Sequence, residues 1–328
     1  MARVVDVPAF VAGARAGEPR AVARLISLIE DDAPSLRDVA AALAPHTGRA
    51  AVIGLTGAPG VGKSTTTSAL ITAMRERGQR VGVLAVDPSS PFSGGALLGD
   101  RIRMQEHATD PGVFIRSMAS RGHLGGLAWA TPQAVRVLDA AGCDVVLIET
   151  VGVGQSEVEV AALADTTVVL LAPGMGDAIQ AAKAGILEVG DLYVVNKADR
   201  EGADVTVREL RAMLALGRDH SGAEPGEWRQ PIVKTVASTG TGIPELLTAL
   251  DEHRVWLEST GAGDEQRRRR AAAEIEALVL EHTRRKLRAS AGTRLAELAT
   301  AVADGRLDPY AAADELRGAT ITDAHLWP

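Results

Sequence analysis

The stretch GAPGVGKST, from Gly57 to Thr65, carries the strongest structural information in this sequence of 328 residues. It matches the pattern G-x-x-x-x-G-K-[ST], in which glycines let the backbone wrap closely around phosphate groups. The apolar run AVIGLT (51–56) precedes it, and the helix-forming stretch TTTSALITAMRERG (65–78) follows it. A chance glycine-rich turn would not have a strand and a helix on its two sides, so we predict a phosphate-binding loop.

The residues of this loop have defined expected roles. Backbone N–H groups should point inward at phosphate, Lys63 should bridge the β- and γ-phosphates, and the Ser64 hydroxyl should bind Mg²⁺. The predicted contacts are Gly57, Ala58, Pro59, Gly60, Val61, Gly62, Lys63, Ser64 and Thr65.

Further apolar runs follow at intervals that leave room for crossover helices. They are rich in β-branched residues and mostly continuous, which is typical of strands buried on both faces of a parallel sheet. We therefore predict an α/β fold whose mainly parallel sheet has helices on both faces and binds ligands at the carboxyl ends of its strands. The runs are VGVLAV (81–86), VFIRS (113–117), DVVLIET (144–150), TTVVLLAP (166–173), DLYVVNK (191–197) and PIVKTV (231–236).

Helical patterns replace strands at both ends of the chain. Apolar residues recur at helical spacing near the N-terminus, and Pro34 and Ser35 then begin a second short helix. After residue 255 a strong helix former presents an apolar face, and Asp308 with Pro309 should open a later helix as its N-cap and first-turn proline. We expect an N-terminal helical extension (1–45), a nucleotide-binding domain (46–255) and a C-terminal helical region (256–328). The predicted faces are Val22, Leu25, Ile26 and Ile29; Leu36, Val39, Ala40 and Leu43; and Ile275, Leu278, Val279 and His282.

Composition excludes several classes of protein. Lys and Arg number 35 against 42 Asp and Glu, and 35 − 42 gives a net charge of −7, which disfavours non-specific binding to DNA or anionic lipid. The single cysteine, Cys143, excludes an intramolecular disulfide and a cysteine-cluster zinc site, and it fits a reducing compartment. Aromatic residues make up only 3%, so Ala, Val, Leu and Ile must fill the core. With no signal-peptide core and no membrane-length apolar run, we expect a soluble cytoplasmic protein.

A run of arginines, Arg267 to Arg270, could form a nucleic-acid patch. We favour a solvated helix face paired with acidic residues, because Glu274, Glu276 and Glu281 lie nearby.

The tetrapeptide NKAD, Asn196 to Asp199, ends the run DLYVVNK. The carboxylate of Asp199 can accept hydrogen bonds from both N1–H and the exocyclic amine of guanine, a donor pair that adenine lacks, so it should select GTP over ATP. Asn196 should brace the base and a neighbouring loop, while the stem of Lys197 covers the base. The alternative is a plain turn capped by Asp199. After the next strand, in TVAST (235–239), the backbone of Val236, Ala237 and Ser238 should also contact guanine.

Three acidic residues are candidates for the metal and the attacking water. Glu149 ends a strand, where it can hold Mg²⁺ through water, and Asp87 and Asp100 are further catalytic and metal-binding candidates. Gly152 leaves the backbone free to approach a γ-phosphate. The alternative for each acid is a helix cap or a turn residue.

Glycine-rich segments, PSSPFSGGALLGDRIRM (88–104) and RSMASRGHLGGLA (116–128), flank these acids and suit elements that nucleotide orders. One of their arginines could act on phosphate, although pairing with Asp or Glu is favoured. His123 could be a base, but a loop histidine without a role is favoured, and Gln155 is a candidate for orienting water. The arginines are Arg101, Arg103, Arg116 and Arg121.

Together these strings resemble the MeaB/ArgK family, the methylmalonyl-CoA mutase-associated GTPases of the SIMIBI class. The resemblance covers nearly the whole chain in family order. It implies a GTPase domain with helical extensions, a homodimer formed by the C-terminal helices, and a GTP-hydrolysing chaperone. Such a chaperone binds a cobalamin-dependent acyl-CoA mutase, gates its cofactor loading and protects it from inactivation. The matching strings are GAPGVGKST (57–65), VDPSSPFSGGALLGDRIRM (86–104), RSMASRGHLGGLA (116–128), ETVGVGQSE (149–157), NKAD (196–199) and DPYAAADELRG (308–318).

Carried over residue by residue, the resemblance implies that Lys63 and Ser64 bind phosphate and Mg²⁺. It places the acids around the metal and the NKAD residues on guanine; these are Asp87, Asp100, Glu149, Asn196, Lys197 and Asp199. One departure is Val236-Ala237-Ser238, where many GTPases carry Ser-Ala, but backbone contacts survive such a change.

Two alternatives remain open. A kinase or transport ATPase of the ArgK type would transfer phosphate to a protein or to arginine, and NKAD argues against ATP. A nickel-type metallochaperone GTPase needs a Cys/His site, whereas Cys143 stands alone and the seven histidines are scattered.

Overall fold

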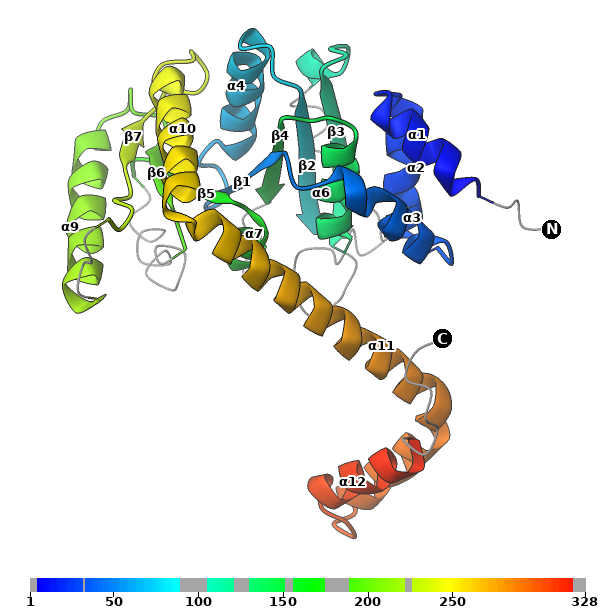
Figure 1. The fold of residues 1–328 in the computed structure, drawn as a ribbon. Helices are drawn as coiled ribbons and strands as arrows, with labels where there is room; N and C mark the ends of the chain where they lie inside the picture. The colour runs from blue at the N-terminus through cyan, green and yellow to red at the C-terminus, as the bar shows by residue number, and fades with distance from the viewer. Residues whose placement is uncertain are drawn as a thin grey trace. The chain divides into compact units, whose positions relative to one another are not determined.

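A computed structural model describes residues 5–31, 33–88, 105–120, 130–150, 156–174, 189–221 and 226–320, and in these residues seven parallel strands form one sheet (Figure 1). The strand order is β3-β2-β4-β1-β5-β6-β7. The predicted α/β fold with a parallel sheet is confirmed, and every predicted apolar run contains a strand. The strands are β1 (Ala51–Thr56), β2 (Val81–Pro88), β3 (Val113–Ser120), β4 (Val145–Thr150), β5 (Thr166–Leu171), β6 (Leu192–Val195) and β7 (Ile232–Lys234).

Helices cover both faces of the sheet. On one face α4 (Lys63–Glu76) and α10 (Ile243–Thr260) pack against side chains such as Leu55 and Leu147. On the other face lie α6 (Thr131–Ala140), α7 (Ser156–Leu163) and, beyond β6, α9 (Ala203–Ser221). These elements, with the N-terminal helices, belong to one compact unit that spans residues 1–264.

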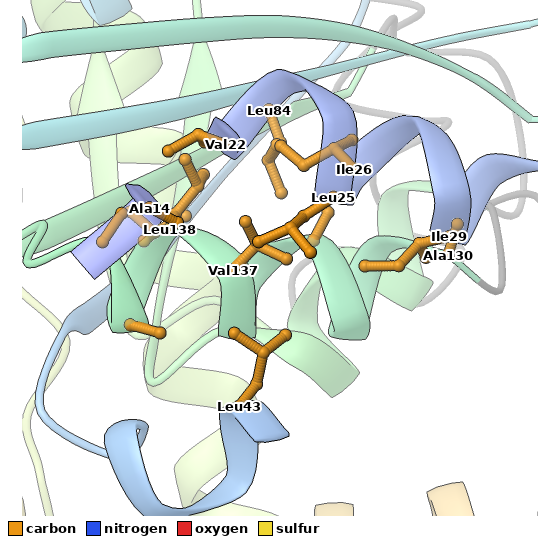
Figure 2. Packing of buried hydrophobic residues seen from close by; sticks show 14 of the residues in the cluster. Ala14, Val22, Leu25, Ile26, Ile29, Leu43, Leu84, Ala130, Val137 and Leu138 are labelled. Carbon is orange, nitrogen blue, oxygen red and sulfur yellow. The ribbon is translucent and has the colours of Figure 1, made fainter. Parts of the chain in front are cut away.

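The N-terminal helices form an additional layer over α6. They are α1 (Val7–Arg15), α2 (Pro19–Glu30) and α3 (Leu36–Leu43), followed by the 3₁₀ turn η1 (Ala44–His46). Figure 2 shows Leu25 and Ile26 of α2 beside Val137 and Leu138 of α6. The predicted face of α2 is confirmed because all four of its residues are buried, whereas in α3 only Val39 and Leu43 are fully buried.

Residues 265–328 form a second compact unit. Within it the long helix α11 (Ala262–Ala303) and α12 (Pro309–Thr320) share a small core that includes Leu298 and Leu316. The Asp308 carboxylate accepts hydrogen bonds from the N–H groups of Tyr310 and Ala311, at 2.9 and 3.0 Å, so the predicted N-cap is confirmed.

Acidic residues pair with members of the arginine run on α11. Arg268 and Arg269 form ion pairs with Glu265, which lies one helical turn before them. Further along α11, Glu281 pairs with Arg284 and Arg285. The arginine run therefore includes acid-paired residues on a solvated helix, as the preferred interpretation requires.

Aspartates fasten the amino-terminal edge of the sheet. Asp144, Asp165 and Asp191 each precede a strand and accept a hydrogen bond from a backbone N–H at the start of the neighbouring strand. The donors are the N–H groups of Arg80, Val52 and Thr167, at 2.7, 2.8 and 2.7 Å. Each carboxylate thereby satisfies a backbone donor at the end of a strand.

Asp191, whose side chain is 30% exposed, lies beside the buried His253 of α10. The His253 ring packs against Trp228 and Trp256, and its Nδ1 lies 2.8 Å from Oγ1 of Thr166. Burial lowers the pKa of His253 to about 4 and raises the pKa of Asp191 to about 6. At neutral pH the imidazole is therefore neutral. Its Nε2 lies 3.6 Å from Oδ1 of Asp191, but the two groups do not form an ion pair.

We predict that Asp191→Asn stabilises the protein above pH 6. The folded chain holds the Asp191 proton up to about pH 6, whereas the unfolded chain releases it near 3.8, so stability from this group is lost as pH rises between these values. Asparagine keeps an acceptor for the Thr167 N–H without this loss. Urea unfolding should show a gain over wild type that grows from pH 4 to 6 and levels off at about 1–2 kcal/mol.

Asp144→Asn is the matched control, because Asp144 makes the same kind of backbone contact from an exposed position. A gain for Asp191→Asn that does not change with pH would contradict this explanation.

Candidate nucleotide-binding site

The phosphate loop occupies the connection between β1 and α4. Gly57, Gly60 and Gly62 all have positive φ angles, of 139°, 82° and 100°. A Cβ on Gly57 would lie 2.3 Å from the Leu170 carbonyl oxygen, and one on Gly62 would lie 2.3 Å from Nδ2 of Asn196. Glycine is required at these two positions both by backbone conformation and by the close approach of neighbouring groups.

Lys63 and Ser64 are buried in the first turn of α4, and both contact groups at the carboxyl edge of the sheet. The Lys63 ammonium donates to the carbonyl oxygens of Gly57 and Ala58, at 2.6 and 3.2 Å. The Ser64 hydroxyl donates to Oε1 of Glu149 at 2.6 Å. The helix N-terminus and the ammonium together offer an anion the donors that a phosphate needs.

Glu149 lies at the end of β4, between β1 and β2, where its side chain is almost fully buried. Its Oε2 accepts a hydrogen bond of 2.8 Å from Oγ1 of Thr67, one helical turn after Ser64. Hydroxyl and carboxylate oxygens are the ligands that Mg²⁺ prefers, so Ser64 and Glu149 suit this ion. Among the described residues no three His, Cys, Asp or Glu side chains form a metal-binding group.

Asn196 connects the phosphate loop to the loop after β7. Its Nδ2 donates to the Val61 carbonyl oxygen at 2.8 Å, and its Oδ1 accepts from the Thr235 hydroxyl and the Ala237 N–H, both at 3.1 Å. β6 ends at Val195, before the end of the predicted apolar run, although the Asn196 N–H still donates to the Leu171 carbonyl oxygen of β5 at 2.9 Å.

Lys197 and Asp199 follow at the same edge. Lys197 adopts a left-handed backbone conformation, with φ of 56°, and its ammonium donates to the Gly60 carbonyl oxygen at 2.6 Å. Asp199 is exposed. β7 is shorter than its predicted run because Val236 leaves the sheet to pair with Thr241, which forms the turn that contains Ala237 and Ser238.

Other predicted residues lie elsewhere. Asp87 lies near the end of β2, at the same edge as Glu149, with its backbone beside Ala119 of β3. Arg116 of β3 donates to the Ser27 hydroxyl at 3.1 Å and forms an ion pair with Glu30, so the pairing favoured for this arginine is confirmed. Outside the described residues lie Asp100, Arg101, Arg103, Arg121, His123, Gly152 and Gln155.

Sequence reasoning missed two hydroxyls of the site, those of Thr67 and Thr235. Thr67 follows Ser64 by three residues, so helical spacing alone could have placed both on the side that faces Glu149. Thr235 gave no comparable signal, because its contact with Asn196 depends on how two loops meet.

The part of the chain that the structure describes contains no helix both long and apolar enough to cross a membrane.

Known proteins resemble this chain along most of its length. Residues 22–292 match the family model described as Methylmalonyl Co-A mutase-associated GTPase MeaB. A Pyrococcus horikoshii protein that is named as a GTPase is 50% identical over 298 residues, which cover 91% of this chain and 93% of that protein. GTPase ArgK of Escherichia coli is 37% identical over 251 residues, covering 75% of this chain and 76% of ArgK.

Two further similarities extend the comparison. The mitochondrial methylmalonic aciduria type A homolog of Mus musculus is 37% identical over 268 residues, covering 80% of this chain and 64% of that protein. The crystal structure of LAO/AO transport system kinase matches the fold with a TM-score of 0.73 at 26% identity, covering 97% of this chain and 99% of the other.

The close approach of Asn196 to Gly62 predicts that alanine is tolerated less well at Gly62 than at Gly60. Gly60→Ala should lower the free energy of unfolding by about 1 kcal/mol, because only its left-handed backbone conformation opposes a side chain. Gly62→Ala should cost about 1–3 kcal/mol more, since its Cβ would displace Asn196 from Val61. Denaturant unfolding without nucleotide measures both, and equal losses would show that the Asn196 contact does not hold the loop.

Proposed function

The chain belongs to the MeaB family of methylmalonyl-CoA mutase-associated GTPases, and on this premise we propose that it is a Mg²⁺-dependent chaperone of a cobalamin-dependent acyl-CoA mutase in the cytoplasm. In this proposal residues 46–255 form the GTPase domain, and GTP hydrolysis gates cofactor loading and protects the mutase from inactivation. The residues 1–45 and 256–328 are its helical extensions, and the second of these forms a homodimer.

The observation that carries the nucleotide assignment is the bond network of Asn196. It joins the loop that would hold phosphate to the two loops that would hold guanine. Asp199 is exposed beside them, where its carboxylate would accept two hydrogen bonds from guanine. Lys197, tied to Gly60, would cover the base, and the backbone of Val236, Ala237 and Ser238 would line its far side.

The residues of α4 and β4 would position phosphate and metal. Lys63 would exchange its contacts with the loop carbonyls for β- and γ-phosphate oxygens. Ser64 and Glu149 would hold Mg²⁺ with Asp87 and Asp100, and the ion would neutralise charge on the phosphates. Thr67 would keep the Glu149 carboxylate in place through its hydrogen bond to Oε2.

The two alternatives have less support. One solved structure that the chain resembles is described as a transport system kinase, so phosphate transfer from ATP is the competing function. The guanine-specific pattern NKAD opposes it. For a nickel-type metallochaperone, Cys143 would have to bind metal, but burial raises the pKa of its thiol to about 11, which keeps it protonated at neutral pH.

We predict that Asp199→Asn transfers nucleotide preference from guanine to xanthine. The amide cannot accept both guanine donors, so kcat/KM for GTP should fall by about 100-fold or more while that for xanthosine triphosphate rises. Steady-state phosphate release with GTP, xanthosine triphosphate and ATP measures this. Glu201→Gln, at an exposed position two residues on, is the control. A wild-type preference for ATP would support the kinase instead.

An exposed apolar face on α11 supports the homodimer. Ile275, Leu278 and Val279 share one side of the helix and are 64%, 44% and 42% exposed in the single chain. Apolar side chains this exposed and this close together are typical of a surface that a second protein chain covers.

We predict that the double variant Ile275→Glu, Val279→Glu is a monomer, because charged side chains would have to be buried against the partner. Light scattering after size-exclusion chromatography measures the mass. Ala277→Glu, which adds the same charge on the opposite side of α11, should remain a dimer. If the wild type is itself a monomer, this part of the proposal is wrong.

A further inference from the structure

A buried polar cluster joins α4 to the 3₁₀ turn η2 (Gln105–His107), beside the residues assigned to the nucleotide. Oγ of Ser68 lies 2.9 Å from Nε2 of His107 and also bonds Oε1 of Glu106. Ser68 and His107 are buried, whereas the Glu106 side chain is 67% exposed. Because an ionised carboxylate only accepts, Ser68 donates to Glu106 and accepts the Nε2–H of His107.

A second hydrogen bond connects the same side of α4 to the segment before β3, two helical turns after Ser68. Arg75 follows Ser68 by seven residues, so the two share a helix face. Nε of Arg75 donates to Oδ2 of Asp110 at 2.9 Å, and Oδ1 of Asp110 accepts from the Gly112 N–H at 2.7 Å. The guanidinium beside it lowers the pKa of Asp110. Residues 105–112, which lead into β3, are therefore bonded to α4 near both ends.

Hydrogen bonds about one helical turn earlier on α4 reach the site itself. Ser64 and Thr67 bond the two oxygens of Glu149, and Ser68 is the next residue after Thr67. The large apolar side chains that α4 buries, Leu70, Ile71 and Met74, all lie in its second half. In the first half, directional polar contacts to Glu149 of β4 and to the η2 turn determine the rotation of the helix about its own axis.

We propose that Ser68 and His107 are positioning residues for the nucleotide site. Their hydrogen bond fixes the rotation of the first turns of α4, and this rotation directs the Ser64 hydroxyl toward the place beside Glu149 that Mg²⁺ would occupy. Neither residue touches nucleotide or metal in this scheme. The inference rests on the proposed function, because it requires Ser64 and Glu149 to share the ion.

The test measures binding of a fluorescent, non-hydrolysable GTP analogue with Mg²⁺ and with EDTA. In the wild type, Mg²⁺ should tighten binding. Ser68→Ala should reduce this tightening by about tenfold, as loss of an outer contact to a metal ligand does. Affinity in EDTA should not change, because the contacts of Lys63 and of the guanine loops remain.

A matched pair at His107 separates the hydrogen bond from packing. His107→Gln retains a polar atom that can reach the Ser68 hydroxyl, whereas His107→Met has similar length and none. Gln should therefore keep the Mg²⁺ response and Met should lose it. Thr72→Ala is the control on α4, because the Thr72 hydroxyl bonds the Ser68 carbonyl within its own helix. This pair also decides the matter if Ser68→Ala does not fold.

The outcomes separate the two proposals. If the wild type does not bind the GTP analogue, the proposed function fails and this inference fails with it. If the wild type responds to Mg²⁺ and both Ser68→Ala and His107→Met respond equally well, only the positioning role is wrong. The positioning role is then wrong even if both variants melt at lower temperature, because a merely structural contact would produce that loss of stability.

Discussion

The buried carboxylate of Glu149 is the contact around which the proposed phosphate site is arranged. A carboxylate this deeply buried is stable only when its oxygens receive hydrogen bonds, and Ser64 and Thr67 supply one to each. These bonds connect the interior strand β4 to the first turns of α4. They also hold two oxygen ligands, the Ser64 hydroxyl and the carboxylate, in positions that a hard cation could use.

The hydrogen bonds of Asn196 are the second set of contacts that holds the site together. The parallel sheet explains why they lie at the same edge as those of Glu149. Parallel strands deliver their carboxyl ends to one edge, so the end of β4 and the loops after β1, β6 and β7 are neighbours although they lie far apart in the chain. The side chain of Asn196 uses both its donor and its acceptor to connect three of them. The loops are thus bonded to one another before any ligand is considered, and binding need not order them from a disordered state.

Much of this could be predicted from sequence because the informative patterns are local. Continuous β-branched runs predicted the strands, and glycines between a strand and a helix predicted the phosphate loop. The ends of β6 and β7 were placed too late, since the contacts of Asn196 with Val61 and of Val236 with Thr241 form only in the folded chain. The same reason hid the Ser68–His107 bond, whose members are 39 residues apart and lie in different elements.

The composition of α4 reflects the different contacts that its two halves make. The sequence KSTTTSALITAM begins with hydroxyl residues and ends with large apolar ones. Apolar packing is non-directional, so Leu70, Ile71 and Met74 hold the helix against the sheet without fixing its rotation finely. Hydrogen bonds depend steeply on angle and can fix it. The Thr66 hydroxyl also bonds back to the carbonyl of Gly62, which keeps this β-branched residue compatible with a helix. A helix that must hold a ligand at its first turn is thus oriented by polar contacts there and anchored by apolar ones beyond.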